Sequence, residues 1–334
     1  MLCYSGFIMA QEHEPKTLQE AVIYFSDLNN CIDYMAVRRW PDGVVCPTCG
    51  RNDAQFLANQ NRWQCKSVHP KRQFSPKVGT IFEDSAIPLQ KWLPAVWSLV
   101  NDKNGISSWE LHRMLGVTQK SAWFMLHRIR LAMQNGSLVK LGGNSGEVEA
   151  DETFIGGKAR NMHKSVKARR ISGQGQSAKD KVIVMGVLER GGKVRTQVIQ
   201  DRTKETLHPI VRQHVQSGVA LFTDELGGYR GLHDEYLHQI IDHAVRYVDG
   251  KIHTNGMENF WSLLKRGING TYVSVEPFHL FRYLDEQVFR YDHRGSKENP
   301  IKDADRFDIA MRQIVGKRLT YAELTGKEGE AEPF

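Results

Sequence analysis

Apolar residues recur at helical spacing in the first part of this 334-residue chain and at strand spacing after residue 146. Residues 14–40, 88–101 and 107–133 place apolar side chains three and four positions apart, which predicts helices. Residues 134–146 are rich in Gly, Asn and Ser, a composition typical of a linker. We therefore expect a helical region joined to a second domain of different architecture.

The last of these helical stretches contains the signals of two helices separated by a tight turn. Ser107 or Ser108 can cap the first helix, and Gly116 can end it. Thr118 can cap a second helix over residues 119–133. This arrangement predicts a helix-turn-helix.

The second helix carries basic residues that suit a DNA surface, namely Lys120, Arg128 and Arg130. The alternative is an ordinary helical hairpin with a solvated basic face. The whole chain has a net charge of +7 and a pI near 9.1, as expected of a protein that contacts phosphates. The basic stretch 158–181 fits either a phosphate-tracking arm or a solvated loop.

After residue 146 strand and helix patterns follow one another, which predicts a mixed α/β sheet. The expected elements are a strand at 147–157, a hairpin at 181–201, a helix at 203–216, strands at 219–223 and 236–241, and helices at 256–271, 278–294 and 304–318. The first strand places Glu147, Glu149 and Asp151 on one face, which is unattractive as simple core. That face is either solvated or a source of metal ligands.

Three carboxylates from distant points of the chain suggest a metal site for phosphodiester chemistry. Asp151 lies on the first strand, Asp224 follows a buried strand, and Glu258 lies on a helix. Two Mg²⁺ ions prefer such oxygen ligands and assist both the attacking and the leaving oxygen, and Mn²⁺ can replace them. Glu149 and Glu152 neighbour Asp151 and are alternatives to it as a ligand.

A second group of residues has the spacing of a structural zinc ribbon. Cys46 and Cys49 form a C-x-x-C pair, and Cys65 and His69 form a second pair. A cysteine near position 68 is the more usual fourth ligand, but that residue is Val68. A redox C-x-x-C is the alternative, and the second ligand pair argues against it.

The sequence argues against a membrane protein and for a reducing compartment. No apolar run approaches the ~20 residues needed to span a bilayer, and two of the five cysteines form the C-x-x-C pair. We expect a cytoplasmic, nucleoid-associated bacterial protein.

Three sequence blocks resemble the catalytic blocks of bacterial insertion-sequence transposases of the DDE type. They read GEVEADETFIGGK, LFTDELGGYRGL and HTNGMENFWSLLKRGINGTYVSVEPFHLFRYLDEQVFRYDHR. Together with the zinc ribbon, they are similar to those of the ISXO-like group over roughly residues 14 to 320. The resemblance implies an RNase H-like catalytic domain that cuts and joins DNA at terminal inverted repeats with Mg²⁺.

Residue by residue, Asp151 and Asp224 match the two aspartates of the family and Glu258 its glutamate. Lys265 matches the basic residue two turns later, which contacts DNA phosphate in such enzymes. Arg266 beside it is a further DNA contact or part of a solvated pair. Asn255, one turn before Glu258, is a candidate to join or replace it at the metals.

The predicted organisation is an RNase H-like mixed α/β sheet domain preceded by a zinc ribbon and a helix-turn-helix. The segments are a helical region at 1–40, the ribbon at 41–79, the helix-turn-helix region at 80–140, the catalytic domain at 146–295, and a C-terminal helix with a polar tail at 296–334. We expect a transposase that acts on double-stranded DNA as a homodimer. The alternatives are a DNA-binding regulator without catalysis and an RNase H-like nuclease or resolvase.

Overall fold

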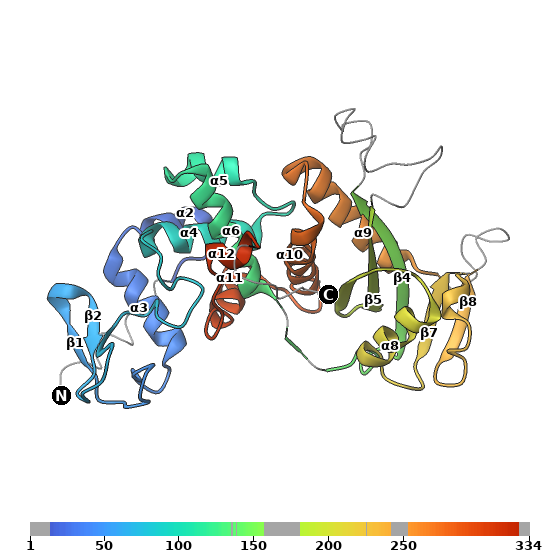
Figure 1. The fold of residues 1–334 in the computed structure, drawn as a ribbon, viewed down its shortest axis with the longest axis horizontal. Helices are drawn as coiled ribbons and strands as arrows, with labels where there is room; N and C mark the ends of the chain where they lie inside the picture. Colours follow the sequence, from blue (N-terminus) through green and yellow to red (C-terminus); the bar gives the residue numbers. More distant parts are fainter. Residues whose placement is uncertain are drawn as a thin grey trace. The chain divides into compact units, whose positions relative to one another are not determined.

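The structure is a computed structural model that describes residues 14–134, 136–137, 139–156, 181–224, 226–241 and 253–326. Residues 158–180 of the predicted basic loop and 327–334 of the polar tail lie outside this range. The described residues form two compact units: unit 1 comprises 14–134 with 293–326, and unit 2 comprises 136–292 (Figure 1). The first border falls at the start of the predicted linker. No helix in these ranges is long and apolar enough to cross a membrane.

Unit 1 combines helices with a small three-stranded antiparallel sheet of order β1-β2-β3. Its elements are α2 (Leu18–Tyr24), α3 (Leu28–Arg39), β1 (Gln55–Leu57), β2 (Arg62–Gln64), β3 (Gln73–Phe74), α4 (Leu89–Asn101), α5 (Ser108–Leu115), α6 (Gln119–Met133), α11 (Asp303–Arg312) and α12 (Tyr321–Leu324). The stretch 14–40 forms two helices because Asp27 caps the second one, accepting a hydrogen bond from the amide of Asn29.

The predicted caps of α5 and α6 are confirmed. Ser107 and Glu110 form a capping box at the start of α5, and Gly116 ends that helix in the left-handed conformation with φ of 59°. Thr118 accepts a hydrogen bond from the amide of Ser121 at the start of α6. The two helices therefore pair across a short turn, as the sequence predicts.

The C-terminal segment is part of the core of unit 1. Phe307 of α11 is buried and its ring contacts those of Phe25, Tyr34 and Trp97. This helix ends at Arg312, earlier than predicted, because the chain that follows it pairs with residues 80 and 81. The amide of Ile81 donates to the carbonyl of Ile314, and Thr80 and Val315 form an antiparallel bridge. Residues 293–326 thus pack with the N-terminal helices.

Unit 2 is built on a mixed five-stranded sheet of order β6-β5-β4-β7-β8. Its strands are β4 (Glu147–Gly156), β5 (Lys181–Glu189), β6 (Val194–Ile199), β7 (Ala220–Asp224) and β8 (Leu237–Ile241). The first three strands pair antiparallel, whereas β7 pairs parallel with both β4 and β8. Strand β4 is therefore central, with the predicted hairpin on one side and the Asp224 strand on the other.

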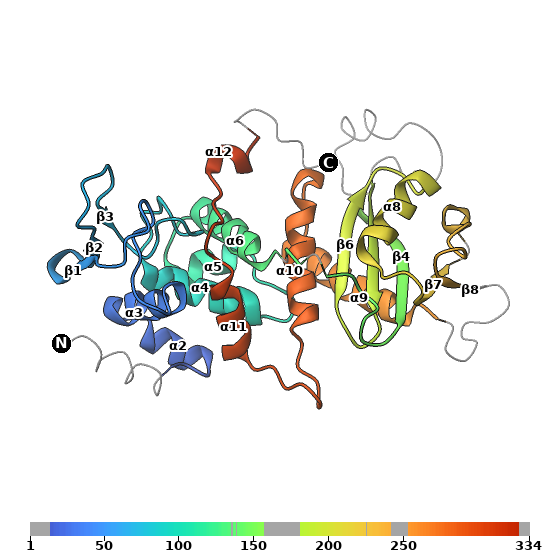
Figure 2. The same ribbon diagram turned by 90° about the horizontal axis from the view of Figure 1, so that it is seen from below.

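Helices cover both faces of this sheet. Helix α8 (Lys204–His214) packs on one face, and α9 (Asn255–Gly267) and α10 (Leu280–Asp292) pack on the other (Figures 1 and 2). Alternation along β4 sends Val148 and Ala150 into the α8 core and Ile155 into the α9–α10 core. Asp151 shares the parity of Ile155 and therefore lies on the α9 face.

Candidate functional site

The four residues predicted to bind zinc lie together in unit 1. The ligand atoms of Cys46, Cys49, Cys65 and His69 all lie within 4.8 Å of one another. Sγ of Cys46 is 3.5 Å from Nε2 of His69, and the two remaining sulfurs are also 3.5 Å apart. The four cysteines that the structure describes are all free thiols. Three thiols and one imidazole so placed fit a closed tetrahedral zinc site.

The imidazole of His69 is oriented by the chain next to it. Its Nδ1 lies 2.6 Å from the carbonyl oxygen of Pro70, a contact that suits an N–H donor. With the proton on Nδ1, Nε2 has a free lone pair directed at the sulfurs, which is the usual arrangement of a metal-binding histidine. His69 can therefore complete the set in the place where a fourth cysteine is more common.

In unit 2 the sheet brings two of the predicted acids side by side. The parallel pairing of β4 with β7 matches Glu149 with Phe222, and continuing this register brings Asp151 level with Asp224. Asp224 is the last residue of β7. The two aspartates thus lie on neighbouring strands and on the same face of the sheet.

Helix α9 brings the third acid to this face. Glu258 lies in its first turn, and Trp261, one turn later, is buried against the sheet. The indole Nε1 of Trp261 donates a hydrogen bond of 3.0 Å to Oδ2 of Asp151. This close packing depends on Gly186 of β5, where a Cβ would lie only 2.2 Å from Cε of Met257 and 2.7 Å from the indole of Trp261.

The acids interact electrostatically. The pKa of Asp151 is raised to about 6, first by burial and then by the negative charges of Asp224 and Glu258, against hydrogen bonds from Glu152 N–H and Trp261 that lower it. Burial also raises the pKa of Glu152 to about 7, although this carboxylate accepts a hydrogen bond from the hydroxyl of Tyr229. Burial is the main cause at both carboxyls, and the neighbouring negative charges add to it.

The acids form a more open arrangement than the zinc group. Among the residues described, only the Cys–His group brings three or more ligand atoms together as closely as 4.8 Å. Mg²⁺ keeps water and substrate phosphate in its coordination shell, so it does not need a closed protein cage. The hard carboxylate oxygens and the mutual repulsion at Asp151 therefore fit Mg²⁺ at Asp151, Asp224 and Glu258.

The side chains predicted near these acids on α9 are exposed. Asn255, Lys265 and Arg266 all lie at the surface. Lys265 follows Glu258 by seven residues, which returns to nearly the same side of a helix. Asn255 precedes Glu258 by three residues and also shares its side.

The prediction that Arg128 and Arg130 lie on the surface of α6 is wrong. Arg128 and Arg130 are buried, with 4% and 1% of their surface exposed. The guanidinium of Arg128 donates to the carbonyls of Leu319, Ile81 and Glu83, so it holds segments of unit 1 together. Lys120, in the first turn of α6, is exposed, and its Nζ lies 4.5 Å from the ring centroid of Tyr321.

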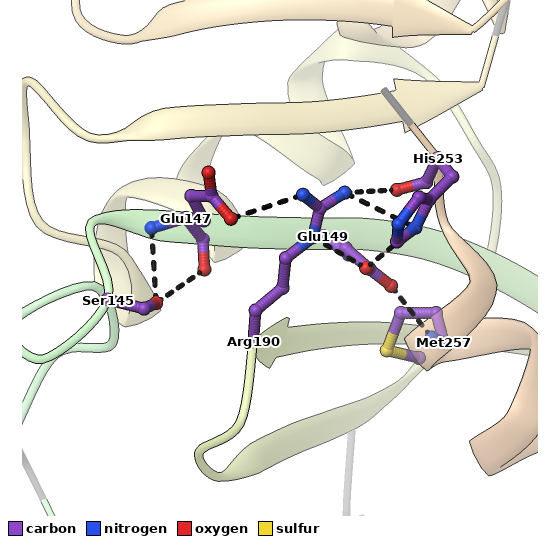
Figure 3. Close-up of polar contacts among 6 residues, drawn as sticks. All are labelled: Ser145, Glu147, Glu149, Arg190, His253 and Met257. Atoms are coloured by element: carbon purple, nitrogen blue, oxygen red, sulfur yellow. Dashed lines mark hydrogen bonds and ion pairs between the residues drawn. The ribbon is translucent and has the colours of Figure 1, made fainter. Parts of the chain in front are cut away.

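A buried ionic network beside the acids escaped the sequence analysis. Glu149 is paired with Arg190, which also contacts Glu147 and His253 (Figure 3). Both oxygens of Glu149, the alternative to Asp151 as a ligand, already accept hydrogen bonds, from Arg190 and from the amide of Met257. The alternation of acids along β4 was the available signal, but the partner Arg190 lies 41 residues away.

The two sites define a class of protein that combines a zinc ribbon with a mixed β-sheet domain carrying a cluster of acidic residues. Residues 143–292 match the family described as ISXO2-like transposase domain, and residues 27–67 match the transposase zinc-ribbon domain. The two ranges span more than half of the chain, and His69 lies just beyond the second. The chain therefore contains a catalytic-type domain and a zinc-ribbon domain of insertion-sequence transposases, as its resemblance indicates.

Two relatives carry names from mobile elements. One is the "Uncharacterized protein in transposable element ISH50" of Halobacterium salinarum, 27% identical over 246 residues, which cover 70% of this chain and 81% of that protein. The other is an "Uncharacterized transposase-like protein" of Haemophilus influenzae, 29% identical over 106 residues, which cover 31% of this chain and 85% of that protein.

Proposed function

We propose that this protein is a DNA transposase that binds terminal inverted repeats, cleaves the strand at each end, and joins the new 3′-OH to target DNA. The observation that carries the proposal is the coupling of Asp151 to Asp224 and Glu258 on β4, β7 and α9. The strand order, with central β4 antiparallel to β5 and parallel to β7, supports an RNase H-like fold for unit 2.

The roles of the residues follow from their positions. Asp151, Asp224 and Glu258 would hold Mg²⁺, which supplies Lewis-acid activation of the attacking oxygen and stabilises the leaving oxygen. Asp151 must lose its proton to act as a ligand. Its pKa is raised to about 6, so most of this carboxyl is ionised at neutral pH. Trp261 orients the carboxylate of Asp151 through its indole hydrogen bond. Lys265 is placed to contact a DNA phosphate beside these acids.

DNA binding is assigned to both units. In unit 1 the exposed N-terminal turn of α6, with Lys120, is the part of a helix-turn-helix that contacts base edges. In unit 2 Arg266 adds positive charge beside Lys265 on α9. The zinc ribbon is assigned the same role of binding the ends of the element. Joining two ends in one reaction requires at least two copies of the chain, so we assign a homodimer on DNA.

The test incubates the purified protein with Mg²⁺, a duplex carrying one end of the element, and a supercoiled target plasmid. We expect joined products with wild-type protein and none with Asp151→Asn, which still binds the end duplex. Cut but unjoined DNA would instead indicate a nuclease or resolvase. Binding without any cleavage would indicate a regulator, and products that survive Asp151→Asn would refute the assignment of the site.

A further inference from the structure

We propose that Glu149 and Arg190 are positioning residues: they hold the start of α9 against the sheet and thereby fix the carboxylate of Glu258 opposite Asp151. This inference rests on the proposed function, because it concerns the same metal site. Neither residue is assigned as a ligand. Their role is to act through Glu258.

Glu149 caps helix α9 from a different element. Its side chain is 1% exposed, and its Oε2 accepts a hydrogen bond of 2.9 Å from the amide of Met257 (Figure 3). Among the residues described, Thr254 at the N-cap position makes no side-chain hydrogen bond to this first turn. A carboxylate at a helix N-terminus also interacts favourably with the helix dipole. The strand therefore supplies the cap that the helix lacks.

Arg190 fixes Glu149 and the chain that enters the helix. Its Nε donates to Oε1 of Glu149 at 2.9 Å, and its Nη2 donates to the carbonyl of His253 at 2.6 Å (Figure 3). Its Nη1 donates to Glu147 at 3.2 Å, and the guanidinium lies 4.0 Å from the ring centroid of Phe222 on β7. One side chain thus joins β4, β7 and the residues just before α9.

The contact leaves little room for a side chain at Gly256. A Cβ at Gly256 would lie 2.8 Å from Oε2 of Glu149 and 3.0 Å from Leu188. Glu258 lies between two tethers to β4, the Met257 amide on Glu149 and the Trp261 indole on Asp151. Loss of the first tether leaves the first turn of α9 free to fray, and Glu258 lies in that turn.

The experiment measures Mn²⁺ binding to the zinc-loaded full chain without DNA, by electron paramagnetic resonance. Asp151→Asn identifies the signal of the acid site. We expect Glu149→Gln and Arg190→Gln each to weaken binding at that site by about tenfold or more, the usual effect of removing a residue that orients metal ligands. The double variant should be no weaker than the worse single variant, because the two residues act as one unit.

The control is a buried pair of the same chemistry that joins the end of α10 to β6. Asp292 has a side chain 1% exposed, lies 3.5 Å from Arg195, and accepts a hydrogen bond of 2.8 Å from the amide of Val194. Asp292→Asn should lower the thermal stability of unit 2 but leave Mn²⁺ affinity unchanged. Equal loss of affinity in Asp292→Asn and Glu149→Gln would mean a merely structural role and would overturn the proposal.

A second pair of variants tests the contact without changing any charge. Gly256→Ala disturbs Glu149 from the helix side and should weaken Mn²⁺ binding, whereas Gly270→Ala, with nothing within 4 Å of its Cβ, should not. Wild-type affinity in Gly256→Ala and Glu149→Gln refutes the inference whatever the protein does to DNA. If Mn²⁺ affinities change among the variants as predicted but the wild-type protein neither cleaves nor joins DNA, the transposase function alone is refuted. Absence of any Asp151-dependent Mn²⁺ site would refute both.

Discussion

Replacing Asp151 by Asn should stabilise the metal-free protein at neutral pH. The pKa of this buried carboxyl is raised from 3.8 to about 6. The folded state therefore favours the protonated form, so the stability that this group contributes is fully present below pH 3.8 and is lost as the pH rises through 6. Asn resembles the protonated acid in shape and cannot ionise, so it avoids this loss.

The magnitude follows from the shift. At about 1.36 kcal/mol per pKa unit, a shift of about two units corresponds to roughly 3 kcal/mol in total, of which about 2.5 kcal/mol falls between pH 4 and pH 7.5. The free energy of unfolding of Asp151→Asn, minus that of wild type, should rise by this amount over that range. For a domain of this size the change corresponds to roughly 5–10 °C in melting temperature.

The assay is urea unfolding at pH 4 and pH 7.5 without added Mg²⁺, and it follows the transition of unit 2, which contains none of the zinc ligands. Asp234→Asn, at an exposed carboxylate of the same unit, controls for the loss of one negative charge. Adding Mg²⁺ at pH 7.5 should stabilise wild type and not Asp151→Asn. A difference between variant and wild type that does not change with pH would refute the assigned burial and charge coupling.

Three further predictions concern other parts of the chain. The purified protein should contain one zinc per chain by atomic absorption; His69→Ala should lower the affinity more than about tenfold, whereas His69→Cys should retain the metal. Arg128→Met should destabilise unit 1 by about 2–4 kcal/mol in urea because three carbonyls lose a charged donor, whereas Lys120→Ala should weaken binding of the end duplex without changing stability. Gly186→Ala should cost about 1–3 kcal/mol of unit 2 stability through overpacking; unchanged unfolding would contradict the close approach of α9.

Local signals predicted the elements well. The capping residues Ser107, Gly116 and Thr118 mark the ends of α5 and α6 correctly because a cap depends on residues a few positions apart. Alternation along β4 placed Glu149 and Asp151 on one face for the same reason. The spacing of the Cys and His residues also predicted the zinc group correctly, including His69.

Long-range packing was not predictable from these patterns. Arg128 lies on α6 between His127 and Ile129, and nothing local indicates that its acceptors include the carbonyl of Leu319, 191 residues away. Glu149 and Arg190 are ordinary charged residues until the sheet and α9 bring them together. Several acids on a buried strand indicate that cationic or hydrogen-bonding partners are needed. Only the fold shows that Glu149 pairs with Arg190 and that Asp151 lies near Asp224 and Glu258.

The position of Phe307 has a consequence for biosynthesis. Because α11 completes the core of unit 1, the N-terminal helices cannot close that core until residues that follow unit 2 leave the ribosome. Unit 2 has all of its strands and covering helices once residue 292 is made. During synthesis the domain that bears the acids is therefore complete first, whereas the zinc-bearing unit still lacks α11.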